Sequence, residues 1–337
     1  MTYKALKSIS SLTLTASLLL TSVNALATEK MRLSAIEPPT STVVQFANSF
    51  SERVQAASHD EIQIKVYPSS QLGDWVEVHE QVMEGTIDLA IQPLSNGFND
   101  VLALQWFPYA ALDFKSGQKA FSEGGVIYET INDALAYQDI KILGAFVSGM
   151  GGIVYTKAAP NPRDPNSDQG LKIRVWPGAT THQALLDRLG YQTAPIPWSD
   201  LYTAMQTGVV DGAIGATPEL AMNNFSDIAK MWVQNNDHFE VSFIAVNKFR
   251  FENLSKEQQM ILSKVASELS AERFAVAEQE HQKYLQQMRD KGIEVVELTK
   301  EELQTVADAV RKDVWPKIQG EIGADNMSKL KLSLGIK

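Results

Sequence analysis

The chain has 337 residues and not one cysteine. This absence excludes disulfide bonds, thiolate metal sites, cysteine nucleophiles and a lipid-modified cysteine behind a signal peptide. Long basic runs are missing too, and the formal net charge of −10 argues against nucleic acid and anionic membrane surfaces as partners. The five histidines show no metal-ligand spacing, so we expect no metal site and no cofactor.

Long apolar runs are confined to the first 27 residues. Lys4 and Lys7, the apolar stretch 9–20 and the small residues Ala25 and Ala27 form the pattern of a signal peptide cleaved after Ala27. An uncleaved membrane anchor is the alternative, but the stretch is short and rich in serine and threonine. Cleavage removes two lysines and no acid, which leaves 310 residues with a net charge of −12. We therefore expect a periplasmic protein whose mature chain does not insert into the membrane.

Catalytic motifs are missing as well. The segment from His79 to Met83 reads HEQVM and lacks the second histidine of a zinc protease. There is no G-x-S-x-G elbow and no glycine-rich phosphate loop. The sequence therefore predicts a binding protein and not an enzyme, with a periplasmic enzyme on a similar two-domain frame as the alternative.

What the sequence does contain is an alternation of strand and helix patterns, which favours an α/β fold, and the first three strand patterns, separated by helices, favour a parallel-type sheet. Helical patterns separate most of the strands, among them a region over 115–138 that Gly124 and Gly125 weaken. We expect strands over 32–36, 61–67, 86–91, 141–147, 153–156, 172–175, 209–214, 239–247 and 293–297.

The stretch 255–291 contains neither glycine nor proline. As one helix it would span about 55 Å, which is longer than a single small domain. Its apolar stripe changes face near Phe274, as expected for a helix that packs on two bodies in turn. A kinked or broken pair of helices is the alternative.

Two lobes joined by crossing strands follow from this organisation. The glycine-rich segment 148–152 marks the first crossing, and the strand 239–247 carries the chain back. We predict lobe I from 28–148 plus 240–279 and lobe II from 149–239 plus 280–337, with the long helix in both. The walls of the cleft between them would be strand ends, where α/β proteins bind ligands.

The central stretch 171–219 carries the most informative residue. The strand Lys172–Val175 must stop before Pro177, which places Arg174 near its carboxyl end. A guanidinium binds a carboxylate through two parallel charge-assisted hydrogen bonds, which lysine cannot reproduce. By itself the residue could equally be a surface arginine.

This stretch resembles the solute-binding proteins of tripartite ATP-independent periplasmic (TRAP) transporters, the dicarboxylate-binding-protein family. The likeness extends from about Met31 to the C-terminus, with a second family-like segment over 66–74 and 84–88. The matching motifs are Gly170-Leu171-Lys172-Ile173-Arg174, Pro195-Ile196-Pro197-Trp198, Tyr202-Thr203-Ala204-Met205-Gln206-Thr207-Gly208 and Val209-Val210-Asp211-Gly212.

The resemblance implies a receptor that binds a small organic carboxylate and delivers it to membrane permease subunits. A receptor that presents its ligand to a sensor is the alternative. The family places the carboxylate-binding arginine at Arg174, an aromatic ligand contact at Trp198 and a polar contact at Gln92. Trp176 shares the strand face of Arg174, and Glu37 follows the first strand, where it could receive an amine or hydroxyl or lie in solvent.

Two departures from the family pattern put the ligand's identity in doubt. Gly215 stands where many members have an asparagine that helps bind the carboxylate, although Thr217 could restore one hydroxyl. The arginine that many acidic-sugar and dicarboxylate binders carry near Gly151 is missing. Fewer donors suggest a monocarboxylate or a more apolar acid.

Overall fold

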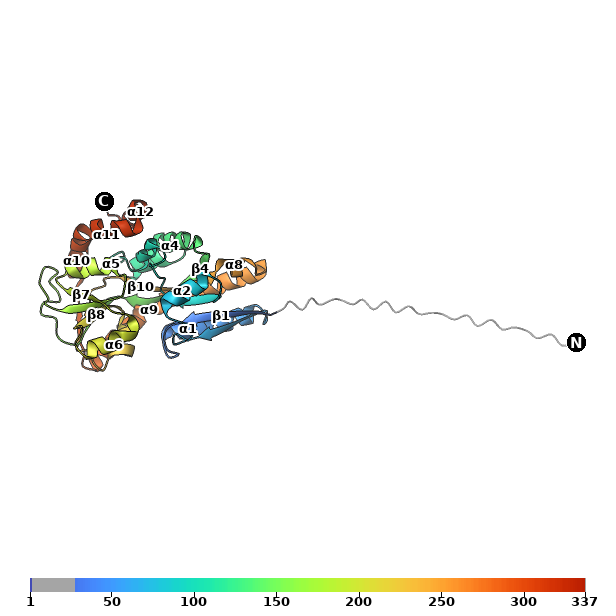
Figure 1. Ribbon diagram of the computed structural model, residues 1–337, viewed down its shortest axis with the longest axis horizontal. Helices are drawn as coiled ribbons and strands as arrows, with labels where there is room; N and C mark the ends of the chain where they lie inside the picture. Colours follow the sequence, from blue (N-terminus) through green and yellow to red (C-terminus); the bar gives the residue numbers. More distant parts are fainter. Residues whose placement is uncertain (2–27, 337) are drawn as a thin grey trace.

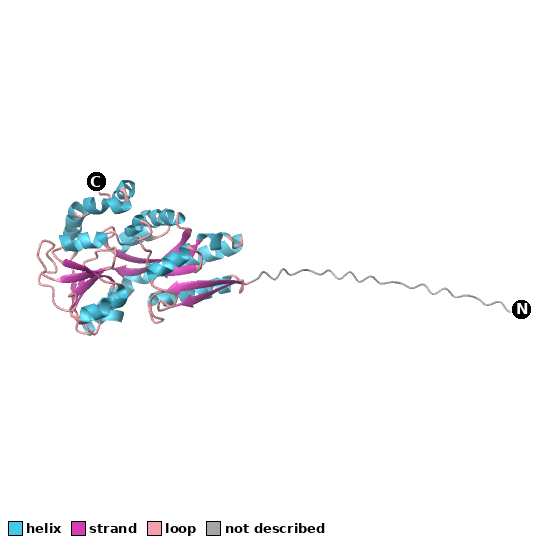
Figure 2. Ribbon diagram, viewed as in Figure 1, coloured by secondary structure: helices cyan, strands magenta, loops and turns pink. Residues whose placement is uncertain are grey.

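The computed structural model describes residue 1 and residues 28–336, so the predicted signal peptide lies, apart from Met1, outside the described residues. Two sheets of an α/β fold lie side by side, with β7 and β8 in one and β1 and β4 in the other (Figure 1). Figure 2 shows the two groups of strands with helices packed around them. The predicted two-lobed α/β class is therefore confirmed.

The first sheet has the strand order β2-β1-β3-β10-β4 and the second has the order β11-β9-β5-β8-β6-β7. The strands of the first are β1 (Glu29–Ala35), β2 (Ile62–Tyr67), β3 (Leu89–Gln92), β4 (Ile140–Met150) and β10 (Phe239–Asn247). The strands of the second are β5 (Gly152–Tyr155), β6 (Lys172–Val175), β7 (Gln192–Pro195), β8 (Gly212–Ala216), β9 (Met231–Gln234) and β11 (Glu294–Glu297).

Helices cover both sheets. They are α1 (Thr42–Ala57), α2 (Trp75–Met83), the 3-10 helix η1 (Asp100–Trp106), α3 (Phe114–Phe121), α4 (Val126–Ala136), α5 (Thr180–Arg188), α6 (Trp198–Gln206), α7 (Pro218–Phe225), α8 (Lys248–Glu252), α9 (Lys256–Asp290), α10 (Lys300–Asp313), α11 (Trp315–Ile322) and α12 (Ala324–Leu334). Capping boxes of Ser255 with Gln258 and of Thr299 with Glu302 begin α9 and α10.

The chain crosses between the sheets at two adjacent places. β4 of the first sheet continues into β5 of the second through Gly151, and β9 returns to β10 through residues 235–238. β10 pairs antiparallel with β4 from Phe239 to Asn247, and the amide of Gly151 donates to the carbonyl of His238 at 2.8 Å. The two crossings therefore form one hydrogen-bonded connection.

The long helix α9 is continuous, which confirms the single-helix prediction over the broken pair. It packs against β4 and α1 of the first body and against α7 and β11 of the second. At about 1.5 Å per residue it spans roughly 50 Å. Its buried face includes Leu262, Val265 and Leu269 on one body, followed by Ala277, Leu285 and Met288.

Several elements escaped prediction for physical reasons. β7 ends in a proline, which a strand accepts only because β7 lies at the edge of its sheet. β9 is short and buried on both faces, so it shows no alternation. The expected helical region at 115–138 is two helices, α3 and α4, separated at the two weakening glycines.

The residue boundaries of the two lobes remain a proposal. The hydrogen-bonded sheet changes between Met150 and Gly152 and again between Gln234 and Phe239. The last two helices, assigned from the sequence to lobe II, pack on lobe I elements: α11 contacts η1 and α12 contacts α4. No helix in the described part of the chain combines the length and apolar character needed to cross a bilayer.

Candidate ligand-binding site

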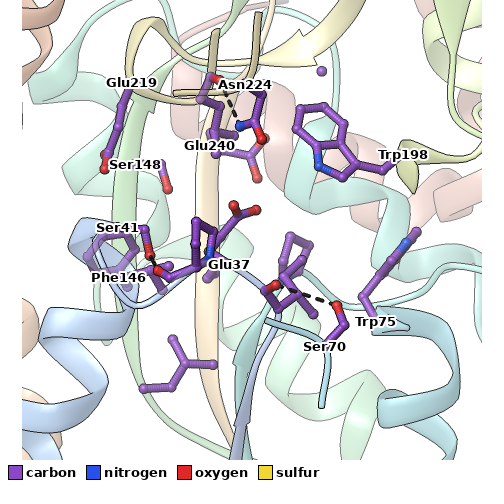
Figure 3. Close-up of a pocket in the computed structure, with 18 of the residues that line it drawn as sticks. Glu37, Ser41, Ser70, Trp75, Phe146, Ser148, Trp198, Glu219, Asn224 and Glu240 are labelled. Carbon is purple, nitrogen blue, oxygen red and sulfur yellow. Dashed lines mark hydrogen bonds between the residues drawn. The ribbon is translucent and has the colours of Figure 1, made fainter. Parts of the chain in front are cut away.

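A cavity of about 300 Å³ lies between the two sheets, at the low end of the size range of small-molecule sites. Residues after the carboxyl ends of β1, β2 and β3 form one wall, and residues at the ends of β6 and β8 form much of the other. Figure 3 shows side chains from both walls directed into the same space. Because the carboxyl edges of both sheets meet here, loop side chains line much of the cavity, together with strand residues such as Phe146, Arg174 and Glu240.

Arg174 lines this cavity as the penultimate residue of β6 and is only 3% exposed. Its Nε donates to the carbonyl of Ile196 at 2.8 Å and its Nη1 to the carbonyl of Ile214 at 3.4 Å. Among residues 28–336, no acid lies within ion-pair distance of its guanidinium. Burial lowers the pKa of Arg174 to about 9, so the group is still charged at neutral pH. A buried cation without a counter-ion is unfavourable, and an anionic ligand would supply the missing partner.

Tryptophans form much of the apolar lining. The rings of Trp75 and Trp106 have centroids 5.9 Å apart, and those of Trp106 and Trp176 are 4.9 Å apart, so three indoles form a continuous wall. Trp198 lies separately, with the Arg174 guanidinium 5.5 Å from its ring centroid. Such rings supply contact area and attract cations over their faces.

The aromatic wall explains why position 215 is a glycine. Its φ of +90° is a conformation that side chains rarely adopt, and a Cβ there would lie 3.0 Å from the Trp176 ring. The predicted loss of an asparagine donor therefore accompanies a gain of indole surface beside Arg174.

Three glutamates point toward the cavity: Glu37, Glu219 and Glu240 (Figure 3). Glu219 accepts hydrogen bonds from the backbone and hydroxyl of Thr42, which join α7 to α1 across the cleft at 2.7–3.1 Å. The carboxyl of Glu37 has no hydrogen-bond partner among the described residues. Burial, reinforced by the charges of Glu219 and Glu240, raises the pKa of Glu37 to about 7.

Glu240 is held by a buried histidine behind the wall. Its Oε2 accepts from His238 Nε2 and from Trp106 Nε1, both at 2.9 Å. His238 Nδ1 also lies 2.6 Å from Asp237, which is fully buried. Burial opposes the charged imidazolium, but Asp237 and Glu240 outweigh that effect and raise the pKa of His238 to about 10.

The same histidine explains the second departure from the family pattern. A Cβ on Gly151 would lie 2.2 Å from the His238 ring, so the space beside this crossing is already filled. An arginine cannot occupy the position unless the ring moves.

The fold also brings together histidines that show no ligand spacing in the sequence. Donor atoms of His182, Asp237 and His238 lie within 4.8 Å of one another. A positively charged His238 binds one oxygen of Asp237 and one of Glu240, while the other oxygen of Asp237 has no hydrogen-bond partner among the described residues.

Five of the seven residues singled out from the sequence line the cavity: Glu37, Arg174, Trp176, Trp198 and Gly215. Gln92 and Thr217 are not among the lining residues. Gln92 is buried and donates through Nε2 to the carbonyl of Trp75 at 2.6 Å. Thr217 is the N-cap of α7, and its hydroxyl accepts from the amide of Leu220. Both side chains support a wall from behind.

Sequence reasoning missed Trp75, Trp106, Glu219 and Glu240, all of which line the cavity. Glu240 had a usable signal, because an acid within the otherwise apolar strand Phe239–Asn247 must find a buried partner. Glu219 follows an N-capping Thr-Pro pair at the end of a strand, which is also a recognisable position. The two tryptophans come from segments with no distinguishing spacing.

Comparisons with known proteins agree with this architecture. The sequence model of the family described as "Bacterial extracellular solute-binding protein, family 7" matches residues 33–320. A "Solute-binding protein" of Chromohalobacter salexigens is 27% identical, over 78% of this chain and 77% of the relative. The C4-dicarboxylate-binding periplasmic protein DctP of Rhodobacter capsulatus is 25% identical, over 89% of this chain and 90% of the relative.

A solved structure shows the same fold. A TRAP periplasmic solute-binding protein from Chromohalobacter salexigens, with bound D-glucuronate, superposes with a TM-score of 0.77 at 21% identity. The match covers 90% of this chain and 99% of that one. The chain therefore belongs to the bacterial extracellular solute-binding proteins of family 7, the two-lobed receptors of TRAP transporters.

Proposed function

We propose that this receptor binds a small organic carboxylate through Arg174 and delivers it from the periplasm to the membrane subunits of a TRAP permease. The observation that carries the proposal is that the charge of Arg174 is not balanced by an acid among the described residues. It is a buried, positively charged side chain on the wall of a cavity, and within residues 28–336 its hydrogen bonds go only to two backbone carbonyls. A ligand carboxylate would replace the solvation that burial removed.

The tryptophans and glycine around Arg174 support the same assignment. Trp198 lies against the Arg174 guanidinium and would pack on the body of the ligand, while Gly215 lets the Trp176 ring approach beside the arginine. Gln92 and Thr217 would act indirectly, by holding the backbone of Trp75 and the start of α7. Two relatives whose printed names specify a C4-dicarboxylate or D-glucuronate also bind acids.

The protein performs no chemistry in this proposal. The ligand would shift an equilibrium between open and closed lobes according to its higher affinity for the closed state. The hydrogen bonds from Thr42 to Glu219 already join the two walls and would belong to that closed state.

A thermal-shift screen of small organic acids tests the proposal, because a ligand bound only by the native state raises its stability. Wild type and Arg174→Ala are screened side by side with the mature chain. We expect one or more carboxylates to raise the melting temperature of wild type and not of Arg174→Ala. Carboxylates that stabilise both proteins equally would contradict the role of Arg174.

A further inference from the structure

The charges around the cavity do not suit a simple acid. Among the residues that the structure describes, its lining includes the four acids Glu37, Asp74, Glu219 and Glu240, and the single cation Arg174. We propose that the ligand is a compact zwitterion, whose carboxylate binds Arg174 and whose cationic nitrogen binds Glu37 against the tryptophan wall. This inference rests on the proposed function and specifies its substrate class.

Each acid except Glu37 has a partner within the protein. Glu240 faces the charged His238 and the indole N–H of Trp106. Asp74 caps α2 by accepting from the amide of Val76 at 3.0 Å. Glu219 accepts from Thr42. The carboxyl of Glu37 has none in the described part of the chain, although its side chain is directed into the cavity (Figure 3). Glu37 is thus the acceptor that a ligand must satisfy.

The charge that a ligand adds to the cavity distinguishes monocarboxylates, dicarboxylates and zwitterions. His238 carries one positive charge between the carboxylates of Asp237 and Glu240, so it offsets none of the other acids. Arg174 therefore faces Asp74, Glu219 and Glu37, whose pKa near 7 leaves it partly ionised at neutral pH. A monocarboxylate would add one negative charge to this surplus and a dicarboxylate would add two. A zwitterion adds none, and it places opposite charges beside Arg174 and Glu37.

Two hydroxyls near Glu37 already donate within the protein: that of Ser41 to the carbonyl of Pro38, and that of Ser70 to the carbonyl of Ile36. Elsewhere in the lining, the hydroxyls of Ser148, Ser199 and Ser242 can donate or accept. An ionised Glu37 carboxylate can only accept, so the ligand group beside it must donate. A cationic N–H both donates and balances charge, and the Trp75, Trp106 and Trp176 rings offer π faces for its alkyl and cationic parts.

The test is calorimetric titration of mature wild type with matched probes. L-Proline and piperidine-2-carboxylate are zwitterions, while cyclopentanecarboxylate and cyclohexanecarboxylate have the same rings without the nitrogen. Succinate represents the dicarboxylates, and 2-hydroxycyclopentanecarboxylate represents an acid that carries a neutral hydroxyl donor and no cationic nitrogen. We expect each zwitterion to bind about tenfold or more tightly than its matched acid and succinate to bind weakest. Equal or tighter binding of the acids, or no binding of either zwitterion at about 10 mM, overturns the inference.

The variant Glu37→Gln sharpens the test, because it should change the two ligand classes in opposite directions. At pH 8 it should weaken zwitterion binding and tighten binding of cyclopentanecarboxylate, since it removes one negative charge from the cavity. Glu84→Gln, an exposed acid at the end of α2, serves as the matched control and should change neither. Parallel losses for both classes in Glu37→Gln would indicate a structural role only and would overturn the inference.

Proton linkage gives a second readout. With the pKa of Glu37 near 7, a bound cation should expel a proton at neutral pH, whereas an added negative charge should take one up. The measured enthalpy should therefore depend on the ionisation enthalpy of the buffer with opposite signs for zwitterions and for acids. Failure of the proposed function can be distinguished from failure of the zwitterion inference. If Arg174→Ala keeps zwitterion binding and pyrrolidine binds as well as proline, the carboxylate anchor is wrong; if acids bind and zwitterions do not, only the inference is wrong.

Discussion

Two buried arginines in different parts of the molecule have nearly the same surroundings and opposite pairing. Arg273 on α9 is 6% exposed, donates through Nε to the carbonyl of Val147 at 2.6 Å and lies 4.7 Å from the Phe146 ring centroid. Arg174 is 3% exposed, donates through Nε to a carbonyl at 2.8 Å and lies 5.5 Å from an indole. Arg273 forms an ion pair with Glu280, whereas the described residues offer Arg174 no acid.

This difference indicates whether a buried arginine stabilises the fold or binds a ligand. A buried arginine with its own carboxylate has its charge balanced inside the protein, so it contributes to the stability of the fold. An arginine whose remaining donors face a cavity has its charge balanced only when a ligand binds, so it contributes to the free energy of binding. The predictions below test this contrast.

The largest effect on stability is expected at Arg273. Replacement by alanine removes a buried side chain, leaves the Val147 carbonyl without its donor and leaves the partly exposed Glu280 without its partner. It should cost about 2–5 kcal/mol of unfolding free energy. Urea unfolding measures the loss. Arg174→Ala is the matched control and should lose only about 1 kcal/mol. It leaves no carboxylate unpaired, and the removal of a buried cation without a counter-ion offsets the hydrogen bonds lost by the carbonyls of Ile196 and Ile214. Equal losses of unfolding free energy in Arg273→Ala and Arg174→Ala would contradict the contrast between the two arginines.

A smaller loss is expected at His238, a third buried cation that is paired like Arg273. His238→Gln keeps one donor and loses the charge, and should cost about 1.5–3 kcal/mol at pH 6. The pKa of His238 is raised from 6.5 to about 10, so its contribution is complete below pH 6.5 and disappears as the pH rises through 10. Wild type and variant should therefore converge in urea unfolding at high pH. A difference that stays constant from pH 6 to 10 would contradict this.

The smallest effect concerns Glu37 in the absence of ligand. Its pKa is raised from 4.5 to about 7, so the folded state holds a proton that the unfolded state releases between these values. Stability should consequently fall as the pH rises from 4.5 to 7. Glu37→Gln should flatten this part of the melting-temperature profile and be the more stable protein at pH 8. An unchanged profile would show that Glu37 is well solvated.

Much of the architecture could be predicted because it follows from local patterns. The run without glycine or proline gave α9, and the proline after β6 placed Arg174 at a strand end. The short buried strand β9 lacked a periodic signal. Side-chain direction was harder, because Gln92 ends β3 at the predicted edge yet turns to the backbone of Trp75. Trp75, Trp106, Glu219 and Glu240 come from four separate segments, and only tertiary packing unites them.

Calorimetric titration of Arg174 variants tests the central claim most directly. The ligand is the tightest carboxylate from the screen, and circular dichroism confirms folding. A hydrogen bond to a charged group contributes about 1.5–3 kcal/mol and two are lost, so Arg174→Ala should weaken binding by about a hundredfold or more. Arg174→Lys keeps the charge without the two-pronged geometry and should fall between alanine and wild type. If Arg174→Ala binds within about threefold of wild type, the carboxylate is anchored elsewhere and the account is wrong.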